Sequence, residues 1–228
     1  REWERYALIK ARVVAGDAAA GEALLKALRP FVYRRYLDFN AIGALRDMKR
    51  MINDEVRRKD LHDNIKLGAG GIREIEFIGQ AFQLMRGGQE PALREHRLLP
   101  VLAYLGAHGY LPAETTTKLR EAYEFLRRVE NAVQMRDDEQ RHALPQDAEA
   151  RGALAAVLGF DGVGAPDQAL AAVRAFVQAE FGRLFAEQDL GDLPKCRVGD
   201  CIGAGKVGSI STSPSGIKRT CTSRHPLR

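Results

Sequence analysis

The chain has 228 residues, of which 45% are hydrophobic and 29% are charged, a composition that is ordinary for a globular protein in water. Its longest apolar runs, such as residues 153–160, are far shorter than the roughly 20 residues of a membrane-spanning helix. The first ten residues carry several charges and no apolar core. The sequence therefore indicates neither a membrane span nor a secretory signal.

The net charge of +5 arises from one end of the chain. Residues 195–228 contain seven of the 35 basic side chains and one of the 30 acidic ones, so the first 194 residues carry a net charge of −1. A basic surface favours binding to nucleic acid or to an anionic membrane. The first 194 residues thus give no electrostatic reason to bind either one.

All three cysteines, Cys196, Cys201 and Cys221, lie in the same basic segment. Their spacing matches no zinc site, and an odd number suits no disulfide framework. Because the first 194 residues lack cysteine, we expect a cytoplasmic protein. The chain starts with Arg1 rather than methionine, from which we expect that it begins inside a longer protein.

Hydrophobic residues recur with a helical period almost as far as residue 190. The pattern predicts a first helix that includes residues 3–13 and ends at Gly16, and a second helix up to Leu28, before Pro30. Further helices are predicted over residues 31–37, 41–59, 72–86, 94–107, 114–140, 147–158 and 166–188. The helix over 41–59 has its apolar positions at Ile42, Leu45, Met48, Ile52 and Val56. The expected fold is all-α, with short loops that favour antiparallel packing.

Residues 195–228 depart from this pattern. They contain no aromatic ring of Phe, Trp or Tyr, eight Ser or Thr and five Gly, so we expect a disordered tail. Residues 203–208 match the dinucleotide pattern G-x-G-x-x-G. That pattern needs a buried strand before it and a helix after it, and neither flank is suitable. We interpret the match as chance.

Residues 66–77, KLGAGGIREIEF, are the first candidate for a functional site. Glycines allow a backbone to approach a ligand closely, and a helix starting near Ile72 would point free N–H groups and its positive dipole end at the loop. Lys66 adds a point charge for a phosphate. The loop is not a Walker A loop, because no Lys-Ser or Lys-Thr pair follows it. The alternative, which the loop chemistry alone favours, is a turn with a glycine N-cap.

The helix after this loop carries a polar stripe. At about 100° per residue, one narrow face contains Arg73, Glu76, Gln80 and Gln83, with apolar residues on both flanks. A helix that is apolar on both flanks is expected to be buried, and buried polar groups must be hydrogen-bonded or line a cavity. The stripe is either one wall of a site or a polar seam between helices, and the sequence does not separate the two.

A second polar cluster lies in residues 125–145. Arg127, Asn131, Gln134 and Asp138 share a helix face, which we interpret as a solvated face, and the same holds for residues 57–60. The spacing of Asp138, Glu139 and His142 fits no metal site.

Several motifs, in order, resemble the bacterial bifunctional glutamine synthetase adenylyltransferase/adenylyl-removing enzymes. They are WERYALIKARVVAG, RPFVYRRYLDF, LRDMKRMI, DNIKLGAGGIREIEFIGQ, QLMRGGQEPAL and FLRRVENAVQ, which lie within residues 1–188. Members of that family join two nucleotidyltransferase domains, one that attaches AMP to a tyrosine of glutamine synthetase and one that removes it by phosphorolysis. The GGIREIEF motif resembles the amino-terminal, adenylyl-removing half.

The resemblance also implies what the chain lacks. The metal-binding carboxylates of the family come from a G-S/S-D-x-D segment and a later D-x-R-L-R-P segment, and neither occurs here. We therefore expect a catalytically inactive piece, namely the helical portion of an α+β nucleotidyltransferase domain. By this resemblance residues 1–65 follow the nucleotidyltransferase core, residues 66–190 form a helical bundle, and residues 191–228 are a disordered or frameshifted tail. No catalytic residue and no metal ligand is assigned within the chain.

The resemblance assigns supporting roles to motif residues on two sides of one cleft. Glu4, Arg5, Lys10 and Arg12 would orient phosphates or the catalytic carboxylates. The other side would be lined by Lys66, Gly70, Gly71, Arg73, Glu76 and Gln80. The ligands implied for the intact enzyme are Mg²⁺ with ATP, and phosphate or ADP in the removal reaction. The implied partners are glutamine synthetase and a PII-type regulatory signalling protein.

Two other functions stay open from the sequence. The first is a non-catalytic helical scaffold that binds glutamine synthetase or its regulatory signalling protein. The second, with less support, is a nucleic-acid binder that uses the basic tail. The abrupt change in composition near residue 190 also suggests a frameshift or a wrongly joined reading frame, which resequencing of the locus would decide.

Overall fold

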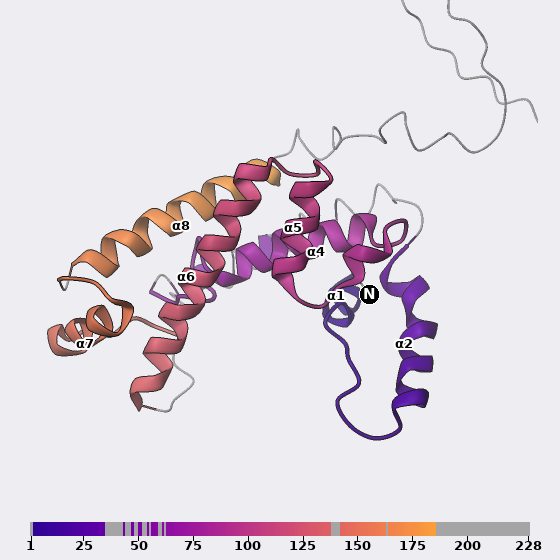
Figure 1. Ribbon diagram of the computed structural model, residues 1–228, viewed down its shortest axis with the longest axis horizontal. Coiled ribbons are helices and arrows are strands. Elements are labelled where there is room, and N and C mark those ends of the chain that lie inside the picture. Colours follow the sequence, from indigo (N-terminus) through magenta and orange to yellow (C-terminus); the bar gives the residue numbers. More distant parts are fainter. Residues whose placement is uncertain are drawn as a thin grey trace, which may run out of the picture. The chain divides into compact units, whose positions relative to one another are not determined.

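The computed structural model describes residues 2–34, 61, 63–137, 142–162 and 164–185, together with scattered positions between 43 and 58. Its elements are α1 (Glu2–Leu8), α2 (Ala18–Val32), α4 (Ile72–Arg86), the 3₁₀-helix η1 (Pro91–Arg94), α5 (Leu98–Ala107), α6 (Ala113–Asp137), α7 (Ala148–Leu158) and α8 (Ala165–Leu184) (Figure 1). The described residues contain no strand, only an isolated antiparallel bridge between Asn64 and Ala143. The predicted all-α class is confirmed.

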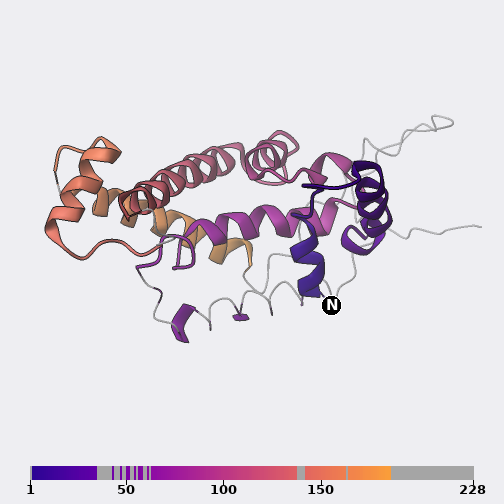
Figure 2. The same ribbon diagram turned by 90° about the horizontal axis from the view of Figure 1, so that it is seen from below.

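Helix α4 is the central element of residues 1–193. It contacts α1, η1, α5, α6 and α8, and Figure 2 shows it running alongside the longer α6. Twelve of its fifteen residues are buried, as expected for a helix with apolar side chains on both flanks. The predicted bounds of this helix are confirmed, including its end at Gly87, whose N–H donates to the Gln83 carbonyl.

Aromatic rings pack around α4 near its N-terminal end. The ring of Phe77, which is fully buried, lies 5.1 Å from the ring centroid of Phe185 and 5.7 Å from those of Tyr6 and Phe181. Edge-to-face and tilted pairs at these separations add stabilisation beyond the burial of area. This cluster joins α1 and α8 to α4, although the two outer helices lie far apart in sequence.

Helix α7 was predicted with the same accuracy as α4, because its ends carry local signals. Asp147 caps the first turn by accepting a hydrogen bond from the Ala150 N–H, and Gly159 ends the helix with a left-handed backbone. Helix α2 also begins at an aspartate cap, where Asp17 accepts from Ala19 and Ala20.

Two predicted helix ends near the start of the chain are wrong. Helix α1 stops at Leu8 instead of continuing to Gly16, because Ile9 turns into the core and its carbonyl contacts His96 Nδ1 at 3.0 Å. Helix α2 passes through Pro30 and ends at Val32. Proline removes one helical hydrogen bond here, the one to the Lys26 carbonyl, and the helix ends two residues later.

Other predicted ends shift by a few residues. Residues 91–94 form a separate 3₁₀ turn, so α5 begins at Leu98, and α8 spans Ala165–Leu184. Helix α6 is described over Ala113–Asp137, and the predicted residues 138–140 lie outside the described residues. The helix predicted over 31–37 is wrong at its start, because residues 31 and 32 end α2 and residues 33 and 34 are not helical, while residues 35–37 lie outside the described residues. The apolar positions Ile42, Leu45, Met48 and Ile52, and the whole tail from residue 191, also lie outside them. In the described part of the chain no helix has the length and hydropathy to cross a membrane.

A polar cluster at Glu90 holds the segments on either side of α5 together. The carboxylate of Glu90 accepts hydrogen bonds from the hydroxyl of Tyr104, at 2.8 Å, and from that of Tyr110. Burial, and then the bond to Glu90, raise the pKa of Tyr110 to about 12. The same two causes, in the same order, raise the pKa of Tyr104.

We expect this cluster to show in an alkaline titration. Because the pKa of Tyr110 is raised in the folded state, its contribution to stability is complete below the ordinary value of 10.0 and is lost as the pH rises through about 12. Glu90→Gln removes the negative charge and should lower the pKa of Tyr110 part of the way towards 10.0. Ultraviolet absorbance of tyrosinate measures this, with Tyr110→Phe identifying the signal. An unchanged titration in Glu90→Gln would contradict the assignment.

Candidate functional site

The glycine loop before α4 is closed by its own hydrogen bonds. The Asn64 side chain accepts from the N–H groups of Lys66, at 3.0 Å, and Leu67, at 2.8 Å. The Gly70 N–H donates to a carboxylate oxygen of Glu74, and the Gly71 N–H donates to the Gly68 carbonyl. This pattern is an Asx-turn followed by a capping interaction from the third residue of the helix.

The first N–H groups of α4 are bonded as well. Ile72, Arg73 and Glu74 donate to the carbonyls of Ile65, Lys66 and Gly71, at 3.2, 3.0 and 3.1 Å. The expectation that these groups are free to meet a phosphate is therefore wrong. The geometry corresponds to the alternative, a turn with a glycine N-cap.

Close packing requires glycine at two positions of the loop. Gly70 has a φ of +68°, and a Cβ there would lie 2.2 Å from the Arg174 carbonyl oxygen of α8. A Cβ at Gly71 would come within 2.9 Å of three carbonyl oxygens. Arg174 in turn donates from Nη2 to the Asn64 carbonyl at 2.7 Å, so the loop and α8 lie against each other. Both glycines therefore have a packing role.

The polar stripe on α4 changes character along the helix. Gln83 is 2% exposed and donates to the carbonyls of Leu93 and Glu95, so it is a structural link to η1. Gln80 is 4% exposed, and its Oε1 has no hydrogen-bond partner in the described part of the chain. Glu76 is half-buried and Arg73 is exposed. The stripe is thus a polar seam at its C-terminal end and accessible at the end that follows the glycine loop.

Glu130 on α6 is a buried carboxylate that contacts an arginine, a histidine and a lysine. It is 3% exposed, and its oxygens lie 2.6 Å from Arg127 Nη1, 3.1 Å from His142 Nδ1 and 3.9 Å from Lys66 Nζ. A carboxylate is tolerated at such burial when it is paired and hydrogen-bonded. Sequence reasoning missed Glu130 and interpreted the neighbouring face as solvated. The one available signal was that Glu130 lies beside Val129 and Leu126, at core positions of the same helix.

Charged and phenolic groups connect Glu130 with the accessible end of the α4 stripe. The pKa of Tyr123 is raised by burial and then by the charges of Glu76 and Glu130, while the positive charge of Arg127 lowers it. The pKa of Tyr6 is raised by burial, with opposing contributions from Arg73 and Glu76. We call this set the polar band. Its members are Tyr6, Lys66, Arg73, Glu76, Tyr123, Arg127, Glu130 and His142.

The structure brings together three of the predicted site residues, Lys66, Arg73 and Glu76, in the polar band. It places two others in a different environment. Arg5 is 2% exposed and donates from Nε and Nη2 to the Val32 carbonyl, which ties α1 to the end of α2. Lys10 is exposed and donates to the His96 carbonyl at 2.8 Å. Glu4 is half-buried and Arg12 exposed.

The carboxylates of the polar band do not fit a Mg²⁺ site. Magnesium requires oxygen ligands in octahedral geometry. In nucleotide-binding proteins these are usually one or two carboxylates that are free to bind it, together with water and substrate phosphates. Of the two carboxylates of the polar band, Glu130 is already bound by Arg127, Lys66 and His142, which leaves only the half-buried Glu76 to face an ion. Within the described residues no three His, Cys, Asp or Glu side chains lie close enough together to hold a metal ion.

Comparison with known proteins assigns the chain to a family. A family model described as GlnD PII-uridylyltransferase matches residues 46–185, which include most of the polar band. The chain belongs to this family. The match covers α4 to α8, the glycine loop and Glu130, and leaves α1 and α2 outside it.

Relatives of the chain include large proteins named bifunctional glutamine synthetase adenylyltransferase/adenylyl-removing enzyme. The protein of Stenotrophomonas maltophilia (strain K279a) is 58% identical over 186 residues, and that of Thioalkalivibrio sulfidiphilus 55% identical over 186; each match covers 82% of this chain. The Pseudomonas aeruginosa protein is 53% identical over 189 residues. The chain spans about a fifth of the length of these relatives. The resemblance found in the sequence motifs is confirmed.

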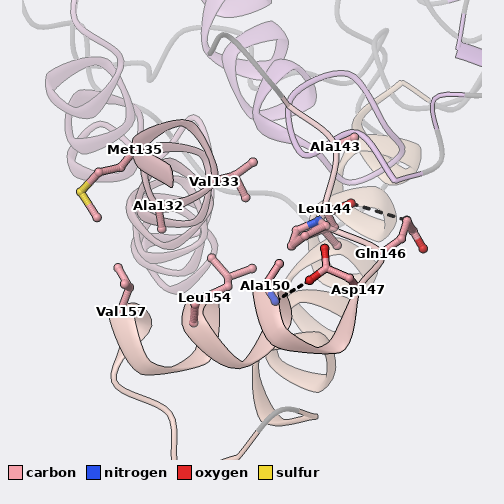
Figure 3. Close-up of a pocket in the computed structure, with 12 residues that line it drawn as sticks. Ala132, Val133, Met135, Ala143, Leu144, Gln146, Asp147, Ala150, Leu154 and Val157 are labelled. Carbon is pink, nitrogen blue, oxygen red and sulfur yellow. Dashed lines mark hydrogen bonds between the residues drawn. The ribbon is translucent and has the colours of Figure 1, made fainter. Parts of the chain in front are cut away.

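An apolar pocket of about 460 Å³ lies near the C-terminal end of α6, between this helix, residues 143–147 and α7 (Figure 3). The figure shows Val133 and Ala132 of α6 facing Leu154 and Ala150 of α7. None of the predicted site residues lines this pocket. Its side chains are Ala132, Val133, Met135, Ala143, Leu144, Pro145, Gln146, Asp147, Ala150, Ala153, Leu154 and Val157.

The packing of the glycine loop predicts a large effect of one methyl group. Gly70→Ala should lower the free energy of unfolding by about 3 kcal/mol, because the new Cβ meets the backbone of α8 and the backbone is left-handed. Gly159→Ala is the matched control, since its φ is +78° and its Cβ would meet nothing within 4 Å. That control should lose only about 1 kcal/mol. Urea unfolding followed by circular dichroism measures both, and equal losses would contradict the proposed contact.

The burial of Glu130 predicts that two glutamate substitutions on α6 will differ in their effect on the free energy of unfolding. Glu130→Gln keeps the shape but removes the charge that faces Arg127, Lys66 and His142, and should cost about 2 kcal/mol of unfolding free energy. Glu114→Gln removes a carboxylate from the same helix whose ion pair with Lys118 is exposed, and should change the unfolding free energy far less. Urea unfolding at neutral pH compares the two. Similar small losses would show that Glu130 is not a buried link.

Proposed function

We propose that the chain is a helical segment of a bifunctional glutamine synthetase adenylyltransferase/adenylyl-removing enzyme, from the adenylyl-removing half. The observation that carries this proposal is the 58% identity over 186 residues to a relative of that name. At this level of identity the helices and the charged groups between them are expected to serve the same reaction. The intact protein would transfer AMP to a tyrosine of glutamine synthetase and remove it by phosphorolysis.

The polar band is the part of the chain proposed to face the reacting groups. Its accessible members Arg73 and Glu76 follow the glycine loop, and Lys66 and Arg127 add positive charge close by. Cations placed at a transferring phosphoryl group stabilise the charge that develops there. The tight bonding of the loop supports this role indirectly, because a rigid turn fixes the position of these side chains.

Metal chemistry is proposed to come from outside this chain. In nucleotidyl transfer, Mg²⁺ neutralises charge between the reacting oxygens. The residues described here do not fit that ion, so the carboxylates that hold it would belong to another part of the longer protein. Lys66, Arg73 and Glu76 would then bind and orient ATP, ADP or phosphate by charge. We expect the isolated chain to be inactive in both reactions.

The partners proposed for the intact protein are glutamine synthetase and a PII-type signalling protein, in the cytoplasm. The relatives' name supports the first partner. A second candidate function is a non-catalytic scaffold for either partner. The observation that favours it is that Arg5, Gln83 and the loop amides serve packing and internal hydrogen bonds.

A chimaera tests the proposal. The segment of the Stenotrophomonas maltophilia enzyme that matches this chain would be replaced by the corresponding residues of this chain, and AMP transfer and AMP release from adenylylated glutamine synthetase would be measured with Mg²⁺ and phosphate. Both activities should be retained. Loss of both in a folded chimaera would contradict the assignment to this enzyme.

Substitutions in the chimaera then separate the two candidate functions. Arg73→Ala and Glu76→Ala should each lower the rate of AMP release by about tenfold or more and leave AMP transfer unchanged. Arg120→Ala, an exposed arginine of α6, is the control and should change neither rate. If Arg73→Ala and Glu76→Ala keep the release rate while binding of glutamine synthetase weakens, the scaffold function is favoured.

A further inference from the structure

A second cavity, separate from the polar band, lies between α1, α2 and η1. We call it the α2 pocket. Its volume is about 250 Å³, and one side of it is apolar. Leu8 of α1 packs there beside Leu25, Leu28 and Val32 of α2. The remaining lining residues are Ala11, Glu22, Arg29, Tyr33, Pro91, Arg94 and His96.

Two guanidinium groups converge on this pocket. Arg94 is held in place from Nε by the Gly87 carbonyl, at 2.6 Å, and from Nη2 by the Gly88 carbonyl, at 3.2 Å. Its guanidinium carbon lies 5.7 Å from the ring centroid of Tyr33. Arg29 and Tyr33 line the same pocket, and the charges of Arg94 and Arg29 both oppose the rise in the pKa of Tyr33 that burial causes.

Among the described residues, no carboxylate forms an ion pair with either arginine. Glu22 lines the pocket two helical turns before Arg29, yet the described residues show no ion pair between Glu22 and either arginine. Arg29 makes no hydrogen bond or ion pair to any described side chain, and Nη1 of Arg94 is also without one. Arg94 is half-buried and Arg29 is exposed. Two cations that face one pocket repel each other, and an anion between them removes that repulsion.

We propose that the α2 pocket binds a small organic anion, a carboxylate or a phosphate monoester. The charged end lies between Arg29 and Arg94, because a guanidinium group binds carboxylate and phosphate oxygens in pairs. The hydrocarbon part lies on Leu25, Leu28 and Val32. The volume suits a ligand smaller than a nucleotide, since pockets for drug-sized ligands start at about 300 Å³.

This site does not depend on the proposed enzymatic function. Tyr6 of α1 faces α4 and the polar band, whereas Leu8 of the same helix faces the α2 pocket. None of the lining residues belongs to the polar band. An anion can therefore bind here whether or not the chain takes part in AMP transfer.

Binding to the whole 228-residue chain tests the proposal. Thermal unfolding would be measured with butyl phosphate, butyrate, inorganic phosphate and chloride at equal ionic strength. Butyl phosphate or butyrate should raise the Tm, as expected for a ligand that binds only the folded state, and chloride should not. The phosphate and carboxylate arms show which head group is preferred. Inorganic phosphate should bind more weakly than butyl phosphate, because it leaves the apolar side of the pocket empty.

Variants locate the site. Arg29→Gln should weaken binding of the preferred anion by about tenfold, measured by calorimetry. The Tm of the free protein should stay unchanged or rise, because the substitution removes the repulsion between Arg29 and Arg94. Arg120→Gln is the matched control, an exposed arginine far along the chain on α6, and should bind as the wild type does. Equal affinities in wild type and Arg29→Gln, or no Tm rise with either organic anion, would overturn the proposal.

Discussion

The structure depends on the burial of α4. Twelve of the fifteen residues of this helix are buried, so its polar groups need partners within the protein, and Gln80 Oε1 is the exception in the described part of the chain. Gln83 reaches two carbonyls beside η1, and Glu74 reaches back to the Gly70 N–H. The position of η1 and the shape of the glycine loop follow from this requirement. Because the loop has to bring Gly70 against the backbone of α8, no side chain larger than hydrogen is accommodated there.

The same requirement explains which parts of the fold can be predicted from sequence. Helices α4 and α7 are bounded by local signals, a glycine at each C-terminal end and, for α7, an aspartate at the start, and both were predicted to within a residue. Helix α1 was predicted too long because the buried position of Ile9 and its contact with His96 are set by residues far along the chain. Pro30 was interpreted as a stop signal, yet α2 continues for two residues beyond it.

The candidate site was harder to predict than the fold, and Glu130 shows why. On a helix rich in charge, a glutamate that is buried looks like its exposed neighbours in sequence. Its partners Lys66 and His142 come from outside α6, so their approach depends on tertiary packing that no periodicity encodes. Periodicity missed a residue of the site, whereas the family motifs included residues that lie outside it. They selected Arg5 and Lys10 along with Arg73 and Glu76, but a motif does not distinguish an arginine bonded to a buried carbonyl from one that is accessible to a ligand.

Helix α1 lies between the polar band and the α2 pocket and belongs to both. It has seven residues, too few for a helix to be stable by itself, so contacts on its two sides determine where it lies. On one side Tyr6 packs on Phe77, and on the other Arg5 donates to the Val32 carbonyl and Leu8 lines the pocket. An anion in the α2 pocket would therefore touch the helix that positions Tyr6 in the polar band. Contact through a shared helix becomes allosteric coupling only if α1 has two arrangements that the anion binds with different affinity. The buried hydrogen bond of Arg5 opposes a second arrangement, because moving α1 would leave a guanidinium group and a carbonyl unpaired inside the protein.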